Sequence, residues 1–302
     1  MLTCDEYITA GSLDQAFAAM DGNRGRCRIV AGATDTLPWA REGRAGDVHI
    51  PVLIDVAKIP ELNERQVSGE RVRLGAATPI QRFLDDGDLG RVMPEMGRCA
   101  VWFADDQIRA QATVGGNIVN ASPAADVTPC LIAHNAVVEL VSRRGRRKLS
   151  LQDFVTGPGQ TALAEGELLA AVECDTLSGY GGSFEKVGHR RSLVIALVCL
   201  ATLVKLDPEG RQVKDARLAI AGIGPRPLRL SNVEDYLKGG PLTAERIGRA
   251  ADMPITLVAS RSRRDYRRDV VRGFVFRGLV HAARLAGATP EAISHDLEAA
   301  YA

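Results

Sequence analysis

The sequence predicts an α+β protein in which an N-terminal α/β domain is followed by a C-terminal domain of antiparallel strands and packed helices. The first observation is the length of 302 residues, because a single hydrophobic core stops growing at roughly 250 to 300 residues. The second is a change of pattern from short apolar runs and helical segments to two long apolar runs followed by helices. The third is a glycine-dense break at residues 178–182. We therefore expect domains at residues 1–175 and 180–302.

The first elements predict a small parallel unit. Ser12 and Gln15 are spaced as in a capping box, and apolar residues then follow at helical spacing, which predicts a short helix. Residues 28–31 and 52–56 have the apolar, β-branched character of buried strands. The stretch between them can be helical up to Gly43. A helix between two buried strands indicates a parallel β-α-β unit.

The next stretch predicts a strand and then two helices. Apolar residues alternate over residues 72–76, as on a half-buried strand. Thr78 and Pro79 are expected to open a helix, with Thr78 as the cap and Pro79 in the first turn. Residues 91–103 are also expected to be helical.

A hairpin is predicted where two apolar segments, residues 135–142 and 148–151, flank a basic tip with Gly145 at the turn. The arginines of the tip, residues 143–147, could contact phosphate. A solvated turn that resists aggregation is the simpler interpretation.

The second domain is predicted to contain another hairpin and a long helix. Residues 196–206 and 213–223 are apolar runs joined by an Asp-Pro-Glu-Gly turn. Residues 265–285 carry apolar side chains on one helical face, so this helix should pack on the second domain's sheet. The basic stretch at its start, residues 261–268, either docks a partner subunit or is a solvated helix face, and we favour the solvated face.

The charge and composition exclude several classes of protein. The 38 basic and 37 acidic residues give a net charge of +1, which argues against a broad nucleic-acid or anionic-membrane surface. With 46% apolar and 25% charged residues, the chain has the composition of an ordinary folded protein. No apolar run approaches the roughly 20 residues of a membrane span, and residues 1–11 lack a basic region followed by an apolar stretch. We expect a soluble, cytoplasmic protein.

Metal and disulfide chemistry is not expected in this chain. The six cysteines lie far apart without a Cys-x-x-Cys pair, so the sequence contains neither a disulfide framework nor a zinc or iron–sulfur ligand set. The five histidines show no paired metal spacing either. We interpret most of the cysteines as small buried hydrophobic residues, namely among Cys4, Cys27, Cys99, Cys130, Cys174 and Cys199.

Two glycine-bearing segments, residues 29–36 and 113–118, are candidates for binding a diphosphate. A diphosphate requires several backbone N–H groups at once, and small residues let the backbone approach within hydrogen-bond distance. Neither segment contains Gly-x-Gly-x-x-Gly, which disfavours a Rossmann dinucleotide site. Most small-residue turns only reverse the chain, so each segment alone is weak evidence.

A third segment, Ala-Ser-Pro-Ala-Ala-Asp at residues 121–126, places a hydroxyl and a carboxylate just beyond the second glycine-bearing segment. Ser122 and Asp126 could accept hydrogen bonds from ribose or ribityl hydroxyl groups. Alternatively, Ser122 and Pro123 are an ordinary helix start, with Asp126 favourable to the helix dipole. Both interpretations remain open from the residues alone.

Nearly the whole chain resembles the FAD-binding subunits of the xanthine dehydrogenase and carbon monoxide dehydrogenase family of molybdenum hydroxylases. The resemblance rests on the order and spacing of Ala-Gly-Ala-Thr-Asp at 31–35, Thr-Val-Gly-Gly-Asn-Ile at 113–118 and the segment at 121–126. Phe-Glu-Lys-Val-Gly at 184–188 and Ala-Gly-Ile-Gly-Pro-Arg-Pro-Leu-Arg at 221–229 support it.

This resemblance implies an FAD site. It implies that the pyrophosphate lies on Ile29, Val30, Ala31, Gly32, Ala33, Thr34, Asp35 and Thr36 and on Thr113, Val114, Gly115, Gly116 and Asn117. It also places Phe103, Asp126, Leu169 and Lys186 at the flavin cofactor. A cation such as Lys186 would stabilise an anionic reduced flavin, whereas without the resemblance it would be interpreted as a solvated strand lysine. The chain departs from the family pattern at Ala33, often glycine, and at Ala110, often asparagine.

The resemblance further implies a fold, a role and partners. The implied FAD domain is of the vanillyl-alcohol-oxidase (PCMH) type, with the small parallel unit and a larger mixed sheet. The chain would take electrons from two 2Fe–2S clusters of an iron–sulfur subunit and pass them to NAD, oxygen, a quinone or a cytochrome. The substrate would react at the molybdenum cofactor of a large molybdopterin-binding subunit, so this chain needs no catalytic residue or metal. A dimer of heterotrimers is the implied assembly.

Two alternatives belong to other classes. A self-contained FAD oxidase would need its own substrate-binding domain, for which the C-terminal part offers little room. A structural subunit that has lost FAD would be colourless when purified.

Overall fold

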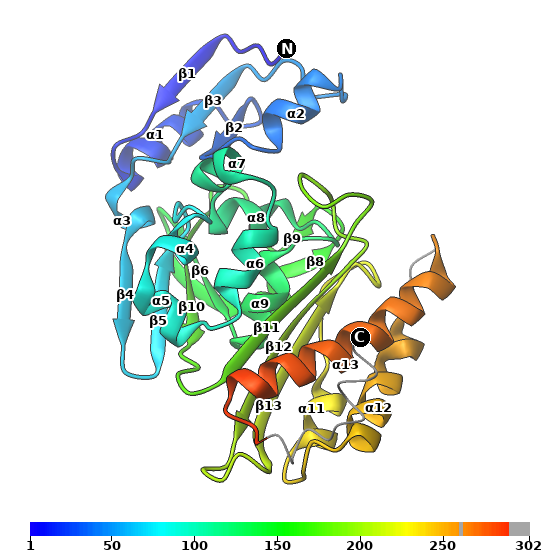
Figure 1. The fold of residues 1–302 in the computed structure, drawn as a ribbon. Coiled ribbons are helices and arrows are strands. Elements are labelled where there is room, and N and C mark those ends of the chain that lie inside the picture. The colour runs from blue at the N-terminus through cyan, green and yellow to red at the C-terminus, as the bar shows by residue number, and fades with distance from the viewer. Residues whose placement is uncertain (260–261, 290–302) are drawn as a thin grey trace.

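The structure, a computed structural model, describes residues 1–259 and 262–289 (Figure 1). Its strands form a three-stranded, a five-stranded and a four-stranded sheet and a two-stranded ribbon, with helices packed against them. The three-stranded sheet contains the first strands of the chain, and the four-stranded sheet contains only strands beyond residue 180. The predicted α+β class is confirmed.

The N-terminal sheet is the predicted parallel unit. It is built from β1 (Glu6–Thr9), α1 (Leu13–Gly22), β2 (Cys27–Val30), α2 (Thr36–Arg41) and β3 (Val52–Asp55), with strand order β1-β3-β2. Both pairings of β3 are parallel. The backbone N–H of Gln15 donates to Ser12 Oγ at 3.2 Å, which confirms the predicted cap of α1. The first strand was not predicted, because it is short and mostly exposed and owes its place to pairing with β3.

The central sheet has the strand order β4-β5-β10-β6-β7. Its strands are β4 (Arg65–Ser68), β5 (Arg71–Gly75), β6 (Val137–Ser142), β7 (Gly145–Ser150) and β10 (Leu168–Asp175). Every neighbouring pair is antiparallel, so the expectation of a mixed sheet is wrong. The physical reason is that two hairpins, β4-β5 and β6-β7, accept β10 between them in the antiparallel sense. The predicted hairpin is confirmed, although Gly145 pairs with Ser142 as the first residue of β7.

Short helices and a ribbon connect the strands of this part. They are α3 (Pro60–Asn63), α4 (Arg82–Asp85), α5 (Gly87–Val92), α6 (Met96–Trp102), α7 (Asp106–Gln111), α8 (Val114–Asn120), α9 (Val127–Ala133), α10 (Leu151–Phe154), β8 (Val155–Gly157) and β9 (Gln160–Thr161). Two helix predictions need correction. Thr78 and Pro79 open no helix, because Pro79 forms a bridge with Thr113 and α4 begins only at Arg82. The helix predicted over 91–103 is interrupted between α5 and α6, where Pro94 has no N–H to continue it.

The C-terminal part contains an antiparallel sheet and helices, as predicted. Its elements are β11 (Gly181–Val187), β12 (Val198–Leu206), β13 (Val213–Ala221), β14 (Leu228–Arg229), α11 (Ser231–Leu237), α12 (Ala244–Asp252), the 3-10 helix η1 (Met253–Leu257) and α13 (Arg264–Leu285). The strands pair in the order β11-β12-β13-β14. As predicted, α13 lies across this sheet (Figure 1). Gly278 packs directly on Thr202 of β12. Arg261 of the basic stretch lies outside the described residues.

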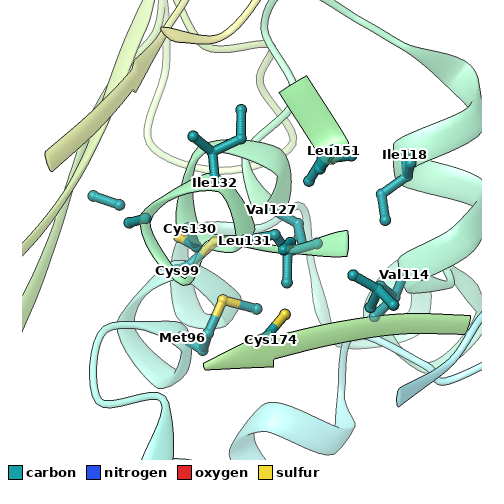
Figure 2. Packing of buried hydrophobic residues seen from close by; sticks show 14 of the residues in the cluster. Met96, Cys99, Val114, Ile118, Val127, Cys130, Leu131, Ile132, Leu151 and Cys174 are labelled. Atoms are coloured by element: carbon teal, nitrogen blue, oxygen red, sulfur yellow. The ribbon is translucent and has the colours of Figure 1, made fainter. Parts of the chain in front are cut away.

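The core between the central sheet and α6, α8 and α9 contains four of the six cysteines. Figure 2 shows Met96, Cys99, Cys130 and Cys174 packed close to one another. Cys99, Cys130, Cys174 and Cys199 are buried, so the interpretation as buried hydrophobic residues is confirmed for these four. Burial raises the pKa of each of these thiols. Cys4 is exposed and Cys27 is partly exposed, and all six cysteines are free.

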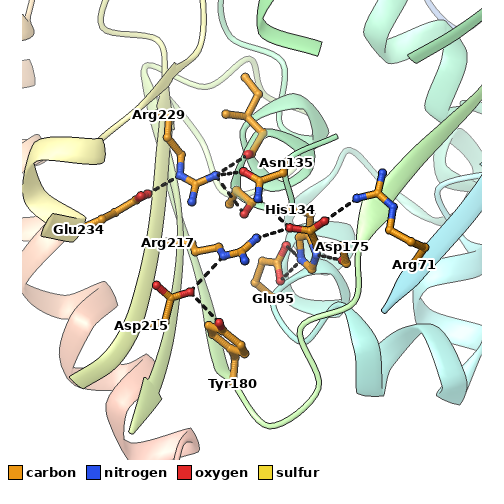
Figure 3. Close-up of polar contacts among 12 residues, drawn as sticks. Arg71, Glu95, His134, Asn135, Asp175, Tyr180, Asp215, Arg217, Arg229 and Glu234 are labelled. Carbon is orange, nitrogen blue, oxygen red and sulfur yellow. Dashed lines mark hydrogen bonds and ion pairs between the residues drawn. The ribbon is translucent and has the colours of Figure 1, made fainter. Parts of the chain in front are cut away.

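A polar network joins the central sheet to the C-terminal sheet (Figure 3). Asp175, the last residue of β10, accepts hydrogen bonds from Arg217 Nη1 and Asn135 Nδ2, both at 2.7 Å, and pairs with Arg71. Next to it, the fully buried His134 lies 2.8 Å from the carbonyl oxygen of Asp175 through Nδ1 and 3.1 Å from Glu95 Oε2 through Nε2. The junction is therefore held by ion pairs as well as by apolar packing.

The free energy of unfolding should depend on the ionisation of Asp175. Burial alone would raise its pKa, but hydrogen bonds from Arg217 and Asn135 and the nearby arginine charges hold the pKa below its ordinary value. A depressed folded-state pKa contributes stability above the unfolded-state pKa of about 3.9, and this contribution is lost as the pH falls through the folded-state pKa. We expect Asp175→Asn to cost roughly 2 kcal/mol at pH 7. Urea unfolding should show this cost shrinking below about pH 4; a pH-independent cost would contradict the ionic role.

Candidate functional site

The first predicted segment leaves the parallel sheet after β2 and enters α2. A side chain at Gly32 is impossible, because its Cβ would lie 1.9 Å from the carbonyl oxygen of Gln111. Ala33 has φ +53°, a left-handed conformation that costs a residue with a Cβ roughly 1 kcal/mol. Within the described part of the chain, the N–H groups of residues 32–35 donate to no backbone or side-chain acceptor. Successive free N–H groups around a left-handed residue form a concave anion-binding nest.

The second predicted segment is the start of α8 rather than a free turn. Thr113 caps this helix, its Oγ1 accepting from the N–H of Gly116 at 3.0 Å. The N–H groups of Val114, Gly115 and Asn117 donate to carbonyl oxygens of the chain at 2.8 to 3.0 Å. A Cβ on Gly115 would meet Ala76 at 2.6 Å, whereas one on the exposed Gly116 would meet only Thr113 Oγ1, at 2.9 Å. The backbone N–H groups of this segment are therefore already engaged. The segment contributes close packing at Gly115 and, at Gly116, a surface without a side chain.

The two segments lie side by side although about 80 residues separate them. Gly32 packs on Gln111 and Ala112, directly before the cap of α8. At the other end of that helix, Asn120 Nδ2 donates to Asp35 Oδ2 at 3.1 Å. The fold therefore places the nest of residues 32–35 beside the surface around Gly116.

Asp126 and Lys186, two further predicted residues, form a buried ion pair. Lys186 Nζ lies 2.5 Å from Asp126 Oδ2 and donates to the carbonyl oxygen of Trp102 at 3.1 Å. Each residue is 8% exposed, so the interpretation of Lys186 as a solvated strand lysine is wrong. Burial raises the pKa of Asp126 to about 6, against the opposing effect of Lys186. Asp126 Oδ1 is buried and has no hydrogen-bond partner among the described residues.

The helix-start interpretation of the third segment is wrong for Ser122 and Pro123, because helix α9 begins only at Val127. Asp126 is the N-cap residue of this helix, but its carboxylate makes no capping hydrogen bond and pairs with Lys186 on β11 instead. Ser122 Oγ accepts from the N–H of Ala124 at 3.3 Å. The carboxylate of Asp126 is therefore fixed by Lys186 on a distant strand and not by a capping hydrogen bond to its own helix.

Phe103 and Leu169 lie in different surroundings. Phe103 ends α6 next to Trp102, and is thereby close to Lys186. Leu169 is 6% exposed on β10 and lies in the core cluster that contains Val114. The structure thus brings Phe103, Asp126 and Lys186 together, and it places Leu169 within the core.

Three residues that support the site were missed from the sequence. Arg109 is buried, and its Nη1 donates to the carbonyl oxygen of Phe103 at 3.0 Å. Ala104, with φ +43°, turns the chain directly after Phe103. Ala76 accepts the N–H of Gly115 at 2.8 Å. The sequence carries no signal for a buried arginine or for an alanine with a positive φ, since both depend on distant contacts.

Over the described residues, no group of three or more metal-binding side chains could hold a metal ion. None of the helices described is long and apolar enough to cross a membrane.

Two family descriptions match the chain. Residues 3–174 match the FAD binding domain in molybdopterin dehydrogenase, and residues 183–282 match the CO dehydrogenase flavoprotein C-terminal domain. The chain is 30% identical to the glyceraldehyde dehydrogenase medium chain of Sulfolobus acidocaldarius, covering 92% of this chain and 98% of that one. It is 29% identical to the xanthine dehydrogenase FAD-binding subunit of Escherichia coli O157:H7, covering 85% and 87%.

A solved structure has a similar fold. A chain of the carbon monoxide dehydrogenase from Hydrogenophaga pseudoflava, in a form that lacks the Mo-pyranopterin moiety, superimposes with a TM-score of 0.86 at 26% sequence identity. The similarity covers 94% of this chain and 99% of that one.

Proposed function

Because the chain belongs to the FAD-binding medium subunits of the molybdenum hydroxylase family, we propose that it carries electrons from a partner's iron–sulfur clusters through one FAD to an external acceptor. It is an oxidoreductase subunit of the xanthine dehydrogenase and carbon monoxide dehydrogenase type. The observation that carries the proposal is the nest of free N–H groups at residues 32–35. When bound, FAD supplies the ability to collect electrons singly and release them singly or in pairs.

The residues of the nest fit a diphosphate. An anion in this concavity would satisfy several N–H groups of residues 32–35 at once. Gly116 lies beside it with no side chain, so the cofactor can approach the backbone closely. Ala33 keeps the left-handed conformation that the nest requires, which supports binding despite the departure from the family pattern.

The Asp126 and Lys186 pair fits the rest of the cofactor. The unpartnered Asp126 Oδ1 is buried and can accept a hydrogen bond from a ligand hydroxyl or N–H group. We propose that Lys186, held by Asp126, orients its positive charge towards the flavin and so favours its anionic reduced form. Phe103 borders the same place, whereas Leu169 would act from within the core.

The proposed partners follow from the family. By analogy with this family, we propose that an iron–sulfur subunit supplies the clusters and a molybdopterin-binding large subunit supplies the substrate site, in a dimer of heterotrimers. We further propose that residues 1–175 form the FAD domain and residues 180–302 the second domain. The six free cysteines suit the reducing cytoplasm.

A test of FAD binding is the replacement of Gly116 by valine. An added Cβ would meet Thr113 Oγ1 at 2.9 Å, and the rest of the side chain would occupy the surface beside the nest. We expect the wild-type chain to take up one FAD and the Gly116→Val variant to remain colourless, as measured by visible absorbance after reconstitution. Full flavin occupancy of the variant would contradict the role of this surface.

A matched control is Gly248→Val in α12, where an added Cβ meets nothing within 4 Å. This variant should bind FAD as the wild type does. A wild-type chain that takes up no FAD would instead favour a structural subunit that has lost its cofactor.

A further inference from the structure

Arg267, in the first turn of α13, is the feature of the structure that the proposed function does not use. Its side chain is buried, with the residue 8% exposed. The guanidinium donates to three backbone carbonyl oxygens, those of Leu197, Gly222 and Ser262, and to Ser262 Oγ. Among the described residues, its acceptors are all carbonyl or hydroxyl oxygens, and none is a carboxylate. A buried cation without a carboxylate partner is costly, which calls for an explanation.

Two chains of hydrogen bonds start at Arg267, and the first, here called the first branch, leads towards Lys186. Arg267 Nη1 donates to the carbonyl oxygen of Leu197, and the N–H of Leu197 donates to the carbonyl oxygen of Val187 at 2.7 Å. Val187 follows Lys186 directly at the end of β11. This branch therefore closes the base of the loop between β11 and β12, at the strand end that carries Lys186.

The second branch leads to Asp126. The same Nη1 donates to the carbonyl oxygen of Gly222 at 2.5 Å, and the N–H of Gly222 donates to the carbonyl oxygen of Pro123 at 2.8 Å. Pro123 lies three residues before Asp126 in the segment that joins α8 to α9. A side chain at Gly222 is excluded, because its Cβ would lie 2.2 Å from the carbonyl oxygen of Leu197. The carbonyl groups of Leu197 and Gly222 therefore lie close together, and both accept from Nη1 of Arg267.

From this juxtaposition we infer that Arg267 is a positioning residue, which sets the relative placement of Asp126 and Lys186 at the flavin site. The inference rests on the proposed FAD-binding function. One nitrogen contacts the residue before β12 and the residue after β13, so loss of that nitrogen frees Leu197 and Gly222 to separate. Asp126 and Lys186 then lose the relative placement in which Asp126 Oδ2 accepts from Lys186 Nζ. The sequence interpretation of this stretch as a solvated helix face is accordingly wrong for Arg267.

The test compares four full-length chains: the wild type, Arg267→Met, Arg267→Lys and Val271→Ala. Val271 is fully buried on the same helix, so its variant loses stability without touching either branch. FAD affinity and the reduction potential of the bound flavin are measured, together with the melting temperature. Arg267→Met should bind FAD roughly tenfold more weakly and shift the potential. Arg267→Lys keeps the positive charge but loses the planar fork, so it should bind FAD more tightly than Arg267→Met and more weakly than the wild type, and Val271→Ala should keep both values.

Equal FAD affinity and potential in Arg267→Met and Val271→Ala would overturn the inference. Amide hydrogen exchange of the wild type provides a second test that involves no variant. Because coupling between two sites is reciprocal, FAD should slow the exchange of the Leu197 and Gly222 N–H groups. Unchanged exchange with FAD bound would also refute the positioning role, whereas a wild-type chain that binds no FAD would refute the proposed function and this inference together.

Discussion

Lys186→Met is expected to lower the free energy of unfolding by about 3 to 5 kcal/mol at neutral pH, because it leaves the buried Asp126 carboxylate without its partner. The side chains of Lys186 and Asp126 are only 2% and 10% exposed, so water cannot replace the lost interaction. Chemical denaturation measures this cost directly. A change of less than about 1 kcal/mol would show that the pair contributes as little as a surface ion pair.

The cost of Lys186→Met should depend on pH. The folded-state pKa of Asp126, about 6, lies above its ordinary value, so the stability contributed by this group is complete below about pH 4 and is lost as the pH rises through 6. Without the lysine the carboxylate is still harder to ionise in the fold. The deficit of the variant should therefore be largest above pH 6 and should shrink as the pH falls towards 4.

The double variant Asp126→Asn/Lys186→Met separates the ion pair from the cofactor role. It leaves no buried charge at this place, so it should recover most of the lost stability. It should not recover the flavin potential, which we expect to be lowered by the loss of the Lys186 charge. Each kcal/mol lost by the reduced flavin corresponds to roughly 20 to 45 mV, for two electrons or one. A potential equal to the wild-type value in both variants would leave Lys186 a purely structural residue.

Gly182→Ala is expected to lower the free energy of unfolding by roughly 3 kcal/mol or more, since overpacking against backbone atoms cannot be relieved by a rotamer change. The Cβ of an alanine on β11 would lie 2.5 Å from the Glu95 nitrogen and 2.8 Å from the Pro94 carbonyl carbon. Strand β11 and the start of α6 would have to separate at the junction of Figure 3. Thermal unfolding of the variant measures the cost.

The control is Gly224→Ala, in the turn after β13, where an added Cβ meets nothing within 4 Å. It should change the melting temperature little. If Gly182→Ala were as mild as this control, the close approach between β11 and α6 would not limit the packing of the junction.

Much of the fold follows from local signals in the sequence. Ser12 caps α1 by accepting from the N–H of Gln15, three residues away. The Asp-Pro-Glu-Gly turn predicts the hairpin β12-β13. The apolar face of α13 likewise appears within the helix itself. Signals that act over a few residues can be recognised without knowing the rest of the chain.

The pairing of distant segments could not be predicted in this way. The sequence contains no sign that β10 enters between two hairpins, so the central sheet was expected to be mixed. Thr78 and Pro79 have the chemistry of a helix start, but the bridge between Pro79 and Thr113 overrides that propensity. Such outcomes depend on which backbone groups meet after collapse of the chain.

For the candidate site, the sequence by itself determined the glycine-bearing segments, the carboxylate at 126 and the absence of metal-ligand spacing. Only the tertiary structure decided that residues 32–35 keep free N–H groups while those of Val114 to Asn117 are already engaged. It also decided that Lys186 is buried against Asp126, 60 residues away. The physical reason is that hydrogen-bond satisfaction and desolvation depend on all the atoms around a group, whereas residue type and spacing describe only its neighbours along the chain.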